Sequence, residues 1–288
     1  MNEQKISILI TGADGFVGRH VAAYLMAQGH NNVTALHRDD LDLSDMDAVV
    51  AKVGDVQPDI IIDCAGITPH QNAHADEHNL NIQFTNNIIN AIHESAHDIG
   101  LIYMSSVSIY GAPSAANGIV SEDDLPNPQS PYAQSKSVCE RLIQNQGAIQ
   151  SIIMRIANIA GKDAFINHVL RNETANLRGD TPFERDIVHM DDICTMVEQS
   201  VRFMIDEQSS HIINCGTGQG FGFDAIIAEI ERQTGMSIAV INEPLMPHDI
   251  IRLICDRQRA ADILNWHPTH TKLDEIIATA IQYHEQIS

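Results

Sequence analysis

Short apolar runs alternate with amphipathic segments over the first two-thirds of the chain. Runs without a polar face are typical of strands that are buried on both sides of a parallel sheet. The clearest are KISILITG (5–12), VTALHR (33–38), PDIIIDCAG (58–66), LIYMSS (101–106) and SIIMR (151–155). The segments between them, such as VGRHVAAYLMAQG (17–29), repeat apolar residues with helical spacing. This alternation predicts an α/β fold with a Rossmann-type, doubly wound parallel sheet.

The alternation loosens after Arg155. The next stretch is polar and mixed, HIINCGTG (211–218) resembles one further strand, and the remainder is mostly helical. We therefore expect a first domain over residues 1–157, to which 186–218 return. Residues 158–185 and 219–288 would form a smaller, mostly helical region.

The composition excludes several classes of partner. The chain has 288 residues and a formal net charge of −21, so we expect no nucleic-acid partner, because phosphate binding needs a basic surface. The N-terminus lacks the pattern of a signal peptide, and no apolar run approaches the roughly 20 residues that span a bilayer. The five cysteines are widely spaced and form no C-x-x-C pair. A cytoplasmic protein without membrane contact or disulfides is expected.

A glycine-rich loop, ITGADGFVG, follows the first predicted strand and precedes the first predicted helix. Glycines at such a junction allow a tight turn and bring backbone N–H groups close to a pyrophosphate at the helix N-terminus. The alternative is a turn with only a structural role. We interpret the first domain as dinucleotide-binding and the smaller region as substrate-binding. The expected cofactor contacts are Gly12, Asp14, Gly15, Phe16, Val17 and Gly18, with Ala65 and Gly66 after the third strand.

The end of the second predicted strand bears on the choice of dinucleotide. An acid there would bind the adenosine ribose hydroxyls of NAD, whereas an arginine would meet the 2′-phosphate of NADP. The chain has His37 and Arg38 at this point, and Asp39 and Asp40 come slightly late. NADP(H) is therefore favoured, with NAD as the alternative. Arg38 could also be a solvated surface cation.

Tyr132 and Lys136 lie four positions apart in SPYAQSKSVCERLI (130–143), which has the pattern of an amphipathic helix. Positions i and i+4 are neighbours on a helix, so the ammonium can lie beside the phenol and favour the phenolate form. A tyrosine activated in this way can serve as a general acid–base. The alternative is an exposed pair between Lys136 and Glu140, which would contribute only some tenths of a kcal/mol.

Together these motifs resemble the extended short-chain dehydrogenase/reductase family of sugar-nucleotide epimerases, dehydratases and ketoreductases. Further similar segments are SSVSIYG (105–111), RIANIAG (155–161), RDIVHMDD (185–192), NCGTG (214–218) and ILNWHP (263–268). The resemblance implies that Ser106, Tyr132 and Lys136 are catalytic, and that Ser106 hydrogen-bonds the reacting oxygen. It places Asp42 and Leu43 at the adenine, and makes Asn158, Arg185 and Arg252 candidate partners of the substrate diphosphate. A homodimer is implied as well.

The same resemblance narrows the reaction. Family dehydratases carry an acid pair just after the serine, where this chain has Val107 and Ser108. The combined epimerase–reductases have a cysteine at the position of Ser108. The favoured function is an NADPH-linked keto-sugar reductase acting on a nucleotide-linked sugar, and the alternative is a nucleotide-sugar 4-epimerase that retains NAD. A non-catalytic dinucleotide sensor is the third hypothesis, although it would not need the intact triad.

Three histidines, His70, His74 and His78, have helical spacing next to Asp76 and Glu77. Histidines four apart can bind zinc, but the chain contains 15 histidines, and so chance spacings are expected. We predict no metal site. Asp191 and Asp192 are interpreted as structural residues at a helix start.

Overall fold

The computed structural model describes residues 6–68, 79–113, 117–179, 183–207, 209–246 and 249–287. The chain divides into two compact units. Unit 1 comprises Met1–Ile109, Ser130–Arg155 and Cys194–Ile213, and unit 2 comprises Tyr110–Gln129, Ile156–Ile193 and Asn214–Ser288. The predicted histidine cluster at 70, 74 and 78 lies outside the described residues.

Unit 1 is built around the predicted parallel sheet. Among the described residues, six strands follow the order β11-β6-β4-β3-β1-β2. Strand β1 pairs in parallel with β2 and β3, and β3 pairs in parallel with β4. The strands are β1 (Ile8–Thr11), β2 (Val33–Ala35), β3 (Ile60–Asp63), β4 (Gly100–Ser106), β6 (Ser151–Ile156) and β11 (His211–Cys215). Every residue of β1, β3 and β6 is buried, as the absence of a polar face predicted.

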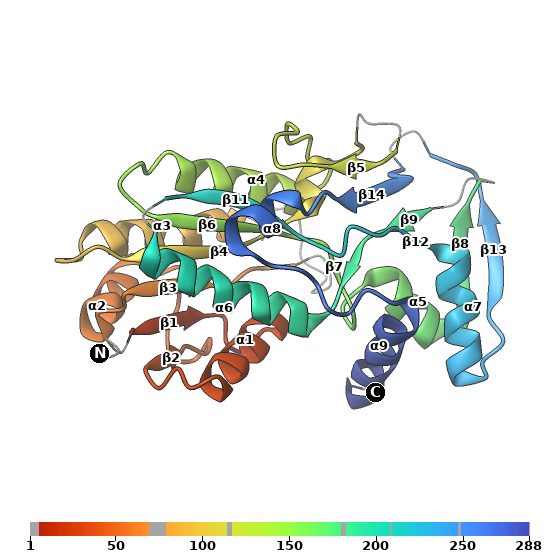
Figure 1. Ribbon diagram of the computed structural model, residues 1–288, viewed down its shortest axis with the longest axis horizontal. Helices are drawn as coiled ribbons and strands as arrows, with labels where there is room; N and C mark the ends of the chain where they lie inside the picture. The colour runs from red at the N-terminus through yellow and green to blue at the C-terminus, as the bar shows by residue number, and fades with distance from the viewer. Residues whose placement is uncertain are drawn as a thin grey trace. The chain divides into compact units, whose positions relative to one another are not determined.

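Helices cover both faces of this sheet, so the predicted doubly wound fold is confirmed (Figure 1). Helices α2, α3 and α4 pack side by side, and α1 lies beside α6, where the Tyr24 hydroxyl donates to Glu198 at 3.0 Å. The helices are α1 (Phe16–Ala27), α2 (Met46–Val56), α3 (Asn79–His93), α4 (Pro131–Gln144) and α6 (Met190–Asp206).

Two of these helices begin at side-chain caps. Asp45 accepts a hydrogen bond from the Ala48 amide at the start of α2, and Ser130 accepts one from the Ala133 amide at the start of α4. Pro131 occupies the first turn of α4, where its missing N–H costs nothing and its fixed φ suits a helix. The cap at Ser130 and the proline at 131 therefore set the start of α4 immediately before Tyr132.

Unit 2 is more irregular and contains more strands than the sequence indicated. Its strands form small sheets with the orders β10-β7, β12-β9-β14-β5 and β13-β8. The strands are β5 (Ile119–Val120), β7 (Asn158–Ile159), β8 (Thr174–Arg178), β9 (Glu184–Arg185), β10 (Ile187–Val188), β12 (Phe221–Gly222), β13 (Ala239–Glu243) and β14 (Arg252–Cys255). The helices are α5 (Ala164–Asn172), α7 (Phe223–Thr234), α8 (Gln258–Leu264) and α9 (Leu273–Ile287), and a short 3₁₀ turn spans Val107–Tyr110.

Each unit has its own hydrophobic core. The core of unit 1 gathers residues of the sheet and of α2, α3 and α4, including Leu9, Ile61, Ile88 and Ile153. The core of unit 2 joins α5, α7 and α9 through residues such as Val169, Ile226 and Ile277. Burial of these side chains is the main source of stability in each unit.

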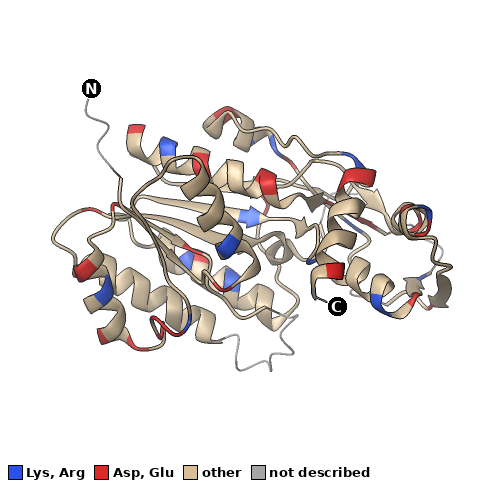
Figure 2. Cartoon of the chain, turned by 90° about the horizontal axis from the view of Figure 1, so that it is seen from below, with Lys and Arg blue, Asp and Glu red and all other residues tan. Residues whose placement is uncertain are grey.

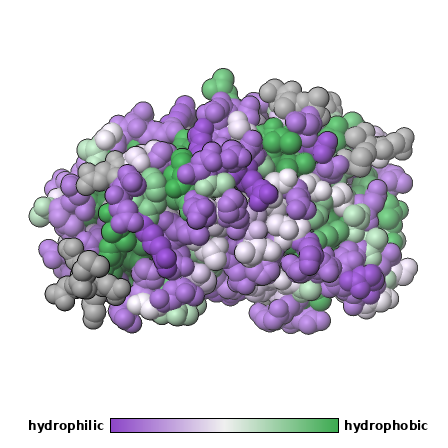
Figure 3. Space-filling view, in the orientation of Figure 1, coloured by the Kyte–Doolittle hydropathy of each residue, from purple (hydrophilic) through white to green (hydrophobic). Residues whose placement is uncertain are grey.

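The surface agrees with the acidic composition. Lys and Arg positions in the described part of the chain are scattered rather than gathered along one element (Figure 2). The face shown in Figure 3 is mostly hydrophilic, interrupted by several apolar areas. Within the described residues, no helix is both long enough and apolar enough to cross a membrane.

Candidate active site

The glycine loop joins β1 to α1 with a backbone that requires glycine at two positions. Gly12 has a φ of +67°, and a Cβ there would lie 2.7 Å from the Ala65 Cα. A Cβ on Gly18 would lie 2.3 Å from the Gly12 carbonyl oxygen. Gly15 is the N-cap of α1, so the first amide groups of the helix meet no side chain from their own cap. These residues fit a dinucleotide, because uncapped amides and the helix dipole favour a pyrophosphate.

The carboxylate of Asp14 reaches from this loop to the residues that follow β2. Its Oδ1 lies 2.7 Å from the Nδ1 of His37, and its Oδ2 accepts a hydrogen bond from the Arg38 amide at 2.5 Å. The Arg38 amide, and after it the His37 ring, lower the pKa of Asp14, and the hydrogen bond with Asp14 raises the pKa of His37. The charged carboxylate of Asp14 therefore lies beside the end of β2, although Asp14 belongs to the loop before α1.

Lys136 is buried at the carboxyl ends of the central strands. Its side chain is 4% exposed, its Nζ donates to the Met104 carbonyl at 2.7 Å, and it lies 4.5 Å from the centre of the Tyr103 ring. Tyr132 is half-buried one turn earlier on α4. A Cβ on Gly66 would lie 3.5 Å from the Lys136 Nζ, so the lysine borders the segment that follows β3.

The alternative of an exposed Lys136–Glu140 pair is wrong. Glu140 is itself buried and forms an ion pair with Arg155 of β6, with an N–O distance of 2.8 Å. It also accepts a hydrogen bond from the Ser105 hydroxyl at 2.5 Å. Lys136 and Glu140 thus both lie on the buried side of α4 but have separate partners. Glu140 pairs with Arg155, and the Lys136 ammonium bonds the Met104 carbonyl of β4.

The three serines near the end of β4 have different environments. Ser105 donates to Glu140, whereas the Ser106 oxygen accepts from the Ser108 amide at 3.2 Å. The Ser108 hydroxyl oxygen is buried and has no hydrogen-bond partner in the part of the chain that the structure describes. Ser105 therefore acts as a structural residue, and Ser106 keeps its hydroxyl hydrogen available for a ligand.

Two buried polar residues that the sequence analysis did not single out hold the segment after β3. Asn81 of α3 accepts from the Ile67 amide at 2.7 Å and donates to the Ile67 carbonyl at 3.1 Å. Its amide also donates to Ser135, whose hydroxyl bonds the Tyr132 carbonyl. Asn81 thereby links this segment to the first turns of α4. The signal was a polar residue at a position of α3 where helical spacing predicts burial.

Asp63 is the second such residue. It ends β3, is buried, and accepts hydrogen bonds from the Thr11 hydroxyl at 2.7 Å and the Ala65 amide at 3.2 Å. Burial raises its pKa. These bonds tie the ends of β1 and β3 together beside the glycine loop and fix Ala65, one of the predicted cofactor contacts.

The other predicted cofactor residues lie at the same edge of unit 1. Phe16 and Val17 open α1. Asp42 follows β2 and accepts from the amide and the hydroxyl of Ser44, at 2.8 and 2.7 Å. Leu43 packs against the core of unit 1, and its carbonyl accepts from Asn87. Hydrogen bonds from Ser44 within the loop and from Asn87 of α3 therefore hold this loop.

The three predicted diphosphate partners belong to unit 2 and are already bonded within it. Asn158 donates to Asp163 at 2.8 Å, and Asp163 caps α5. Arg185 donates to the carbonyls of Ile250 and Ile251, and its guanidinium lies over the rings of Phe183 and Phe223 at 5.8 and 5.7 Å. These contacts orient the arginine. Burial lowers the pKa of Arg185, and the nearby charges of Asp163 and Asp249 oppose this shift.

Arg252 differs from Arg185 in its partner. It lies on β14 and forms an ion pair with Glu184 of the neighbouring strand β9, with an N–O distance of 2.9 Å. A phosphate would have to share this guanidinium with the carboxylate. Of the two arginines, Arg185 is therefore the better candidate for binding a diphosphate.

One cluster in the described residues has groups that could hold a metal ion, namely His189, Asp191 and His270. Both ring nitrogens of His189 are engaged, since Nδ1 accepts from the Asp191 amide at 3.1 Å and Nε2 lies 2.9 Å from the Thr279 hydroxyl. Asp192 is fully buried and accepts from the amides of Thr269 and His270. This cluster fixes the start of α6, as predicted for the two aspartates.

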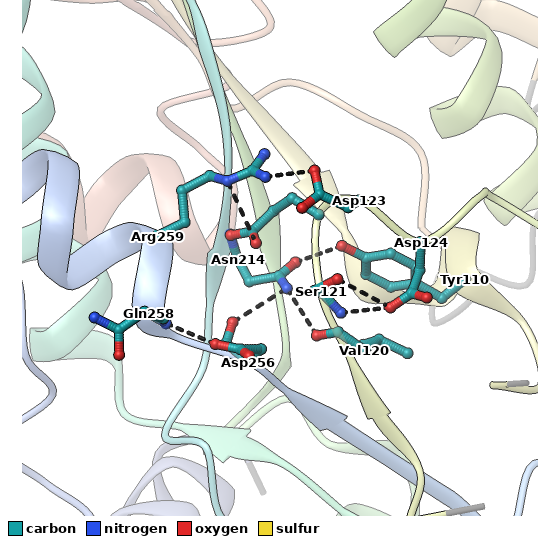
Figure 4. A network of polar contacts seen from close by, with 10 residues as sticks. Tyr110, Val120, Ser121, Asp123, Asp124, Asn214, Asp256, Gln258 and Arg259 are labelled. Atoms are coloured by element: carbon teal, nitrogen blue, oxygen red, sulfur yellow. Dashed lines mark hydrogen bonds and ion pairs between the residues drawn. The ribbon is translucent and has the colours of Figure 1, made fainter. Parts of the chain in front are cut away.

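A buried polar network surrounds Asn214, which begins the NCGTG motif (Figure 4). Its side-chain oxygen accepts from the Tyr110 hydroxyl at 2.7 Å, and its amide donates to the carbonyls of Val120 and Asp256 at 3.1 and 3.2 Å. Its backbone N–H donates to Glu122 at 2.6 Å. The network fastens β5 to the end of β14 within unit 2, so this motif has a structural role.

Comparison with known proteins agrees with this geometry. A UDP-glucose 4-epimerase of Azospirillum brasilense is 24% identical, over 97% of this chain and 92% of that protein. A GDP-6-deoxy-D-mannose reductase of Pseudomonas aeruginosa is 25% identical, over 92% of each chain. The crystal structure of a UDP-glucose 4-epimerase from Stenotrophomonas maltophila, with bound NAD and formylated UDP-arabinopyranose, gives a TM-score of 0.85 at 19% identity and covers 98% of both chains.

The predicted family is confirmed by a match to most of the chain. The model of the NAD dependent epimerase/dehydratase family matches residues 8–216, a range that includes the glycine loop, Ser106, Tyr132 and Lys136. The protein is accordingly an NAD(P)-dependent enzyme rather than a non-catalytic sensor. With its fold, its glycine loop and its tyrosine–lysine helix in agreement, this chain belongs to the NAD dependent epimerase/dehydratase family.

Proposed function

We propose that the protein is a nucleotide-sugar 4-epimerase that uses NAD. The observation that carries the proposal is the buried Lys136 on α4, held at the ends of the central strands one turn from Tyr132, with Ser106 at the end of β4. UDP-glucose 4-epimerases of several organisms resemble the chain over nearly its whole length, at 22–24% identity. This makes epimerisation a better-supported reaction than the one-way reduction that the sequence favoured.

The roles of the residues follow from their chemistry. Tyr132 takes the proton of a sugar hydroxyl as the carbon beneath it is oxidised, and returns the proton when the keto-sugar is reduced from its other face. Lys136 favours the phenolate form of Tyr132 by its charge. Ser106 donates its hydroxyl hydrogen to the reacting oxygen and holds it in place. A bound nicotinamide dinucleotide supplies the acceptor and donor of hydride.

The cofactor would be held by unit 1. The amide groups at Gly15 and the following residues of α1 suit the pyrophosphate, and the close approach at Gly12 and Gly18 keeps the loop tight enough for backbone contact. Asp42 and Leu43 would border the adenine, and Ala65 and Gly66 the segment nearer to Lys136. These placements are supported by the position of these residues, all of which follow strands of the same parallel sheet.

The substrate diphosphate would be held by unit 2. Arg185 is the preferred partner because its guanidinium is oriented by carbonyls and aromatic rings rather than by a carboxylate. Asn158 and Arg252 are further candidates. Nucleotide-sugar binding is supported by the similarity to a UDP-glucose 4-epimerase and a GDP-6-deoxy-D-mannose reductase.

An NADPH-linked keto-sugar reductase is the second candidate. The GDP-6-deoxy-D-mannose reductase of Pseudomonas aeruginosa is as similar as the epimerases, and a structure from that organism in complex with NADPH matches the fold with a TM-score of 0.77 at 23% identity. Arg38 after β2 is the residue of this chain that favours NADP.

The test is interconversion of UDP-galactose and UDP-glucose by purified protein without added cofactor, followed by proton NMR. An epimerase returns hydride to the same substrate, so turnover should proceed and should be lost in Tyr132→Phe. A reductase would leave these sugars unchanged and would consume NADPH with a nucleotide-linked 4-keto-6-deoxyhexose. That outcome would replace the first candidate by the second. Mass spectrometry of the cofactor released by denaturation separates the two independently.

A further inference from the structure

The glycine loop and the end of β2 are joined more closely than their sequence separation suggests. The Ala13 amide donates to the Leu36 carbonyl at 3.0 Å, which continues the β1–β2 pairing beyond the strands. One residue further along the loop, the Asp14 carboxylate accepts the Arg38 amide at 2.5 Å and meets the His37 ring at 2.7 Å. The loop thus places an acid against the residues that follow β2.

We propose that Asp14 recognises the adenosine ribose and selects NAD over NADP. This inference rests on the proposed function only in assuming that a nicotinamide dinucleotide lies along the glycine loop. In dinucleotide-binding sheets an acid at the end of the second strand hydrogen-bonds the ribose 2′-hydroxyl. Here that acid is absent from the second strand, and the structure supplies a carboxylate at the same place from the loop before α1.

The Asp14 carboxylate has room and acceptor capacity for a ribose. Its side chain is 54% exposed; Oδ1 meets the His37 ring and Oδ2 accepts the Arg38 amide. A carboxylate oxygen has two lone pairs, so each oxygen can accept a further hydroxyl. The bonds to His37 and Arg38 hold the group in one orientation, which makes His37 a positioning residue.

Charge argues in the same direction. The Arg38 amide and the His37 ring keep the pKa of Asp14 below its ordinary value, so the carboxylate is charged at neutral pH. Asp39 and Asp40 lie close enough to raise the pKa of His37, and Asp40 accepts the His37 amide at 2.9 Å. A 2′-phosphate carries about −1.5 to −2 charges at neutral pH. The Asp14 carboxylate, which is bonded to the His37 ring and the Arg38 amide, would repel a phosphate at this place.

The experiment compares the cofactor preference of three proteins: the natural chain, Asp14→Asn and Asp39→Asn. Each is dialysed against an equimolar mixture of NAD and NADP until the bound ratio is constant, then denatured, and the released dinucleotides are measured by mass spectrometry. We expect NAD in excess on the natural chain. Asp14→Asn should shift the ratio towards NADP by roughly tenfold, through loss of ribose hydrogen bonds and of like-charge repulsion.

Asp39→Asn is the matched control, because it removes the same charge nearby, whereas the loop contacts this segment through Asp14, His37 and Arg38. It should leave the ratio within about twofold. The inference is overturned if the natural chain binds NADP in excess, if Asp14→Asn leaves the ratio unchanged, or if Asp39→Asn shifts it equally. Asp14→Ser replaces Asp14→Asn should the latter fail to fold. No sugar enters this measurement, so an absence of epimerisation would reject the proposed function and leave this result standing.

Discussion

Glu140 on the buried side of α4, the candidate catalytic helix, forms an ion pair with Arg155 of β6. The Arg155 Nη2 lies 2.8 Å from the Glu140 Oε2, and both side chains are 3% exposed. Glu140 follows Lys136 by one turn of α4, and its other oxygen accepts from Ser105, the neighbour of Ser106. The pair therefore connects α4 and β6, and through Ser105 also β4, next to the residues that carry the proposed catalytic groups.

Arg155→Met should strongly destabilise the protein, because it leaves the Glu140 carboxylate buried without a countercharge. Removal of one partner of a buried ion pair typically costs about 3–5 kcal/mol. We expect a clear fall in the thermal midpoint and in the urea midpoint. At permissive temperature, loss of the support beneath α4 should lower kcat more than it changes KM.

Arg232→Met is the matched control for this variant. Arg232 forms an ion pair with Glu229 on the surface of α7, and its side chain is 64% exposed. Its removal should leave the midpoints almost unchanged, since exposed pairs contribute little. Equal midpoints for Arg155→Met and the natural chain would show that the buried pair does not support α4.

Lys136→Met should abolish most of the activity and preserve the fold. Methionine fills a similar space in this buried position, but it removes the charge beside Tyr132 and the bond to the Met104 carbonyl. Loss of general acid–base function lowers rates by about 10²–10⁴-fold. The measurement is kcat for the sugar interconversion, with circular dichroism as a check of folding.

Lys272→Met serves as the control for lysine removal, because Lys272 is 73% exposed on the surface. Its activity should match that of the natural chain. A Lys136→Met protein that kept more than a tenth of the natural kcat would contradict the proposed role of the lysine.

His37 should titrate above the usual range of a histidine. The hydrogen bond and the charge of Asp14 raise the pKa of His37. A raised folded-state pKa means that the imidazolium contributes stability below the unfolded-state pKa, and that this contribution is lost as pH rises through the folded-state pKa. The titration can be followed by NMR of the ring, with the resonance assigned by its absence in His37→Gln. Asp14→Asn should return the pKa of His37 towards its ordinary value. If His37 has the same pKa in this variant as in the natural chain, Asp14 is not the cause of the shift.

The fold of unit 1 was predictable because its strands and helices each have a signal in their own stretch of sequence. Strands such as Ile60–Asp63 have apolar residues on both faces, and α4 has its cap at Ser130 and its proline at 131. The family and the α/β fold followed from these patterns and the motifs. Unit 2 was harder to predict, because strands of two residues such as β9 and β12 are too short to show a period.

The arrangement of the candidate site could be predicted where one element carries the signal, and it could not where two segments combine. Tyr132 and Lys136 share a helix, so their spacing sufficed. The carboxylate of Asp14 reaches the end of β2 only through pairing of β1 with β2, and sequence order alone suggested Arg38 and NADP. Asn81 was missed for a related reason, since its partners lie on a loop and on a different helix.

Asn214→Asp should destabilise unit 2 although it conserves shape. The Asn214 side chain donates to two buried carbonyls, of Val120 and Asp256, and an ionised aspartate cannot donate. Buried carbonyls without donors cost about 1–3 kcal/mol each. The new charge would also belong to a residue whose backbone N–H is already bonded to the Glu122 carboxylate. Because burial raises the folded-state pKa of the new aspartate, its penalty should grow as pH rises above the unfolded-state pKa. Thermal melts at pH 7 and near pH 4 measure both effects.

Asn117→Asp is the control that isolates the donor. Asn117 is exposed, and its side-chain oxygen accepts the Ile119 amide at 3.2 Å, a bond that aspartate retains. Its melting temperature should match that of the natural chain. If Asn214→Asp melts like Asn117→Asp at pH 7, the two carbonyls do not depend on the amide, and Asn214 does not fasten β5 to β14. A deficit at pH 7 that shrinks near pH 4 would identify the lost donors and the buried charge together as its cause.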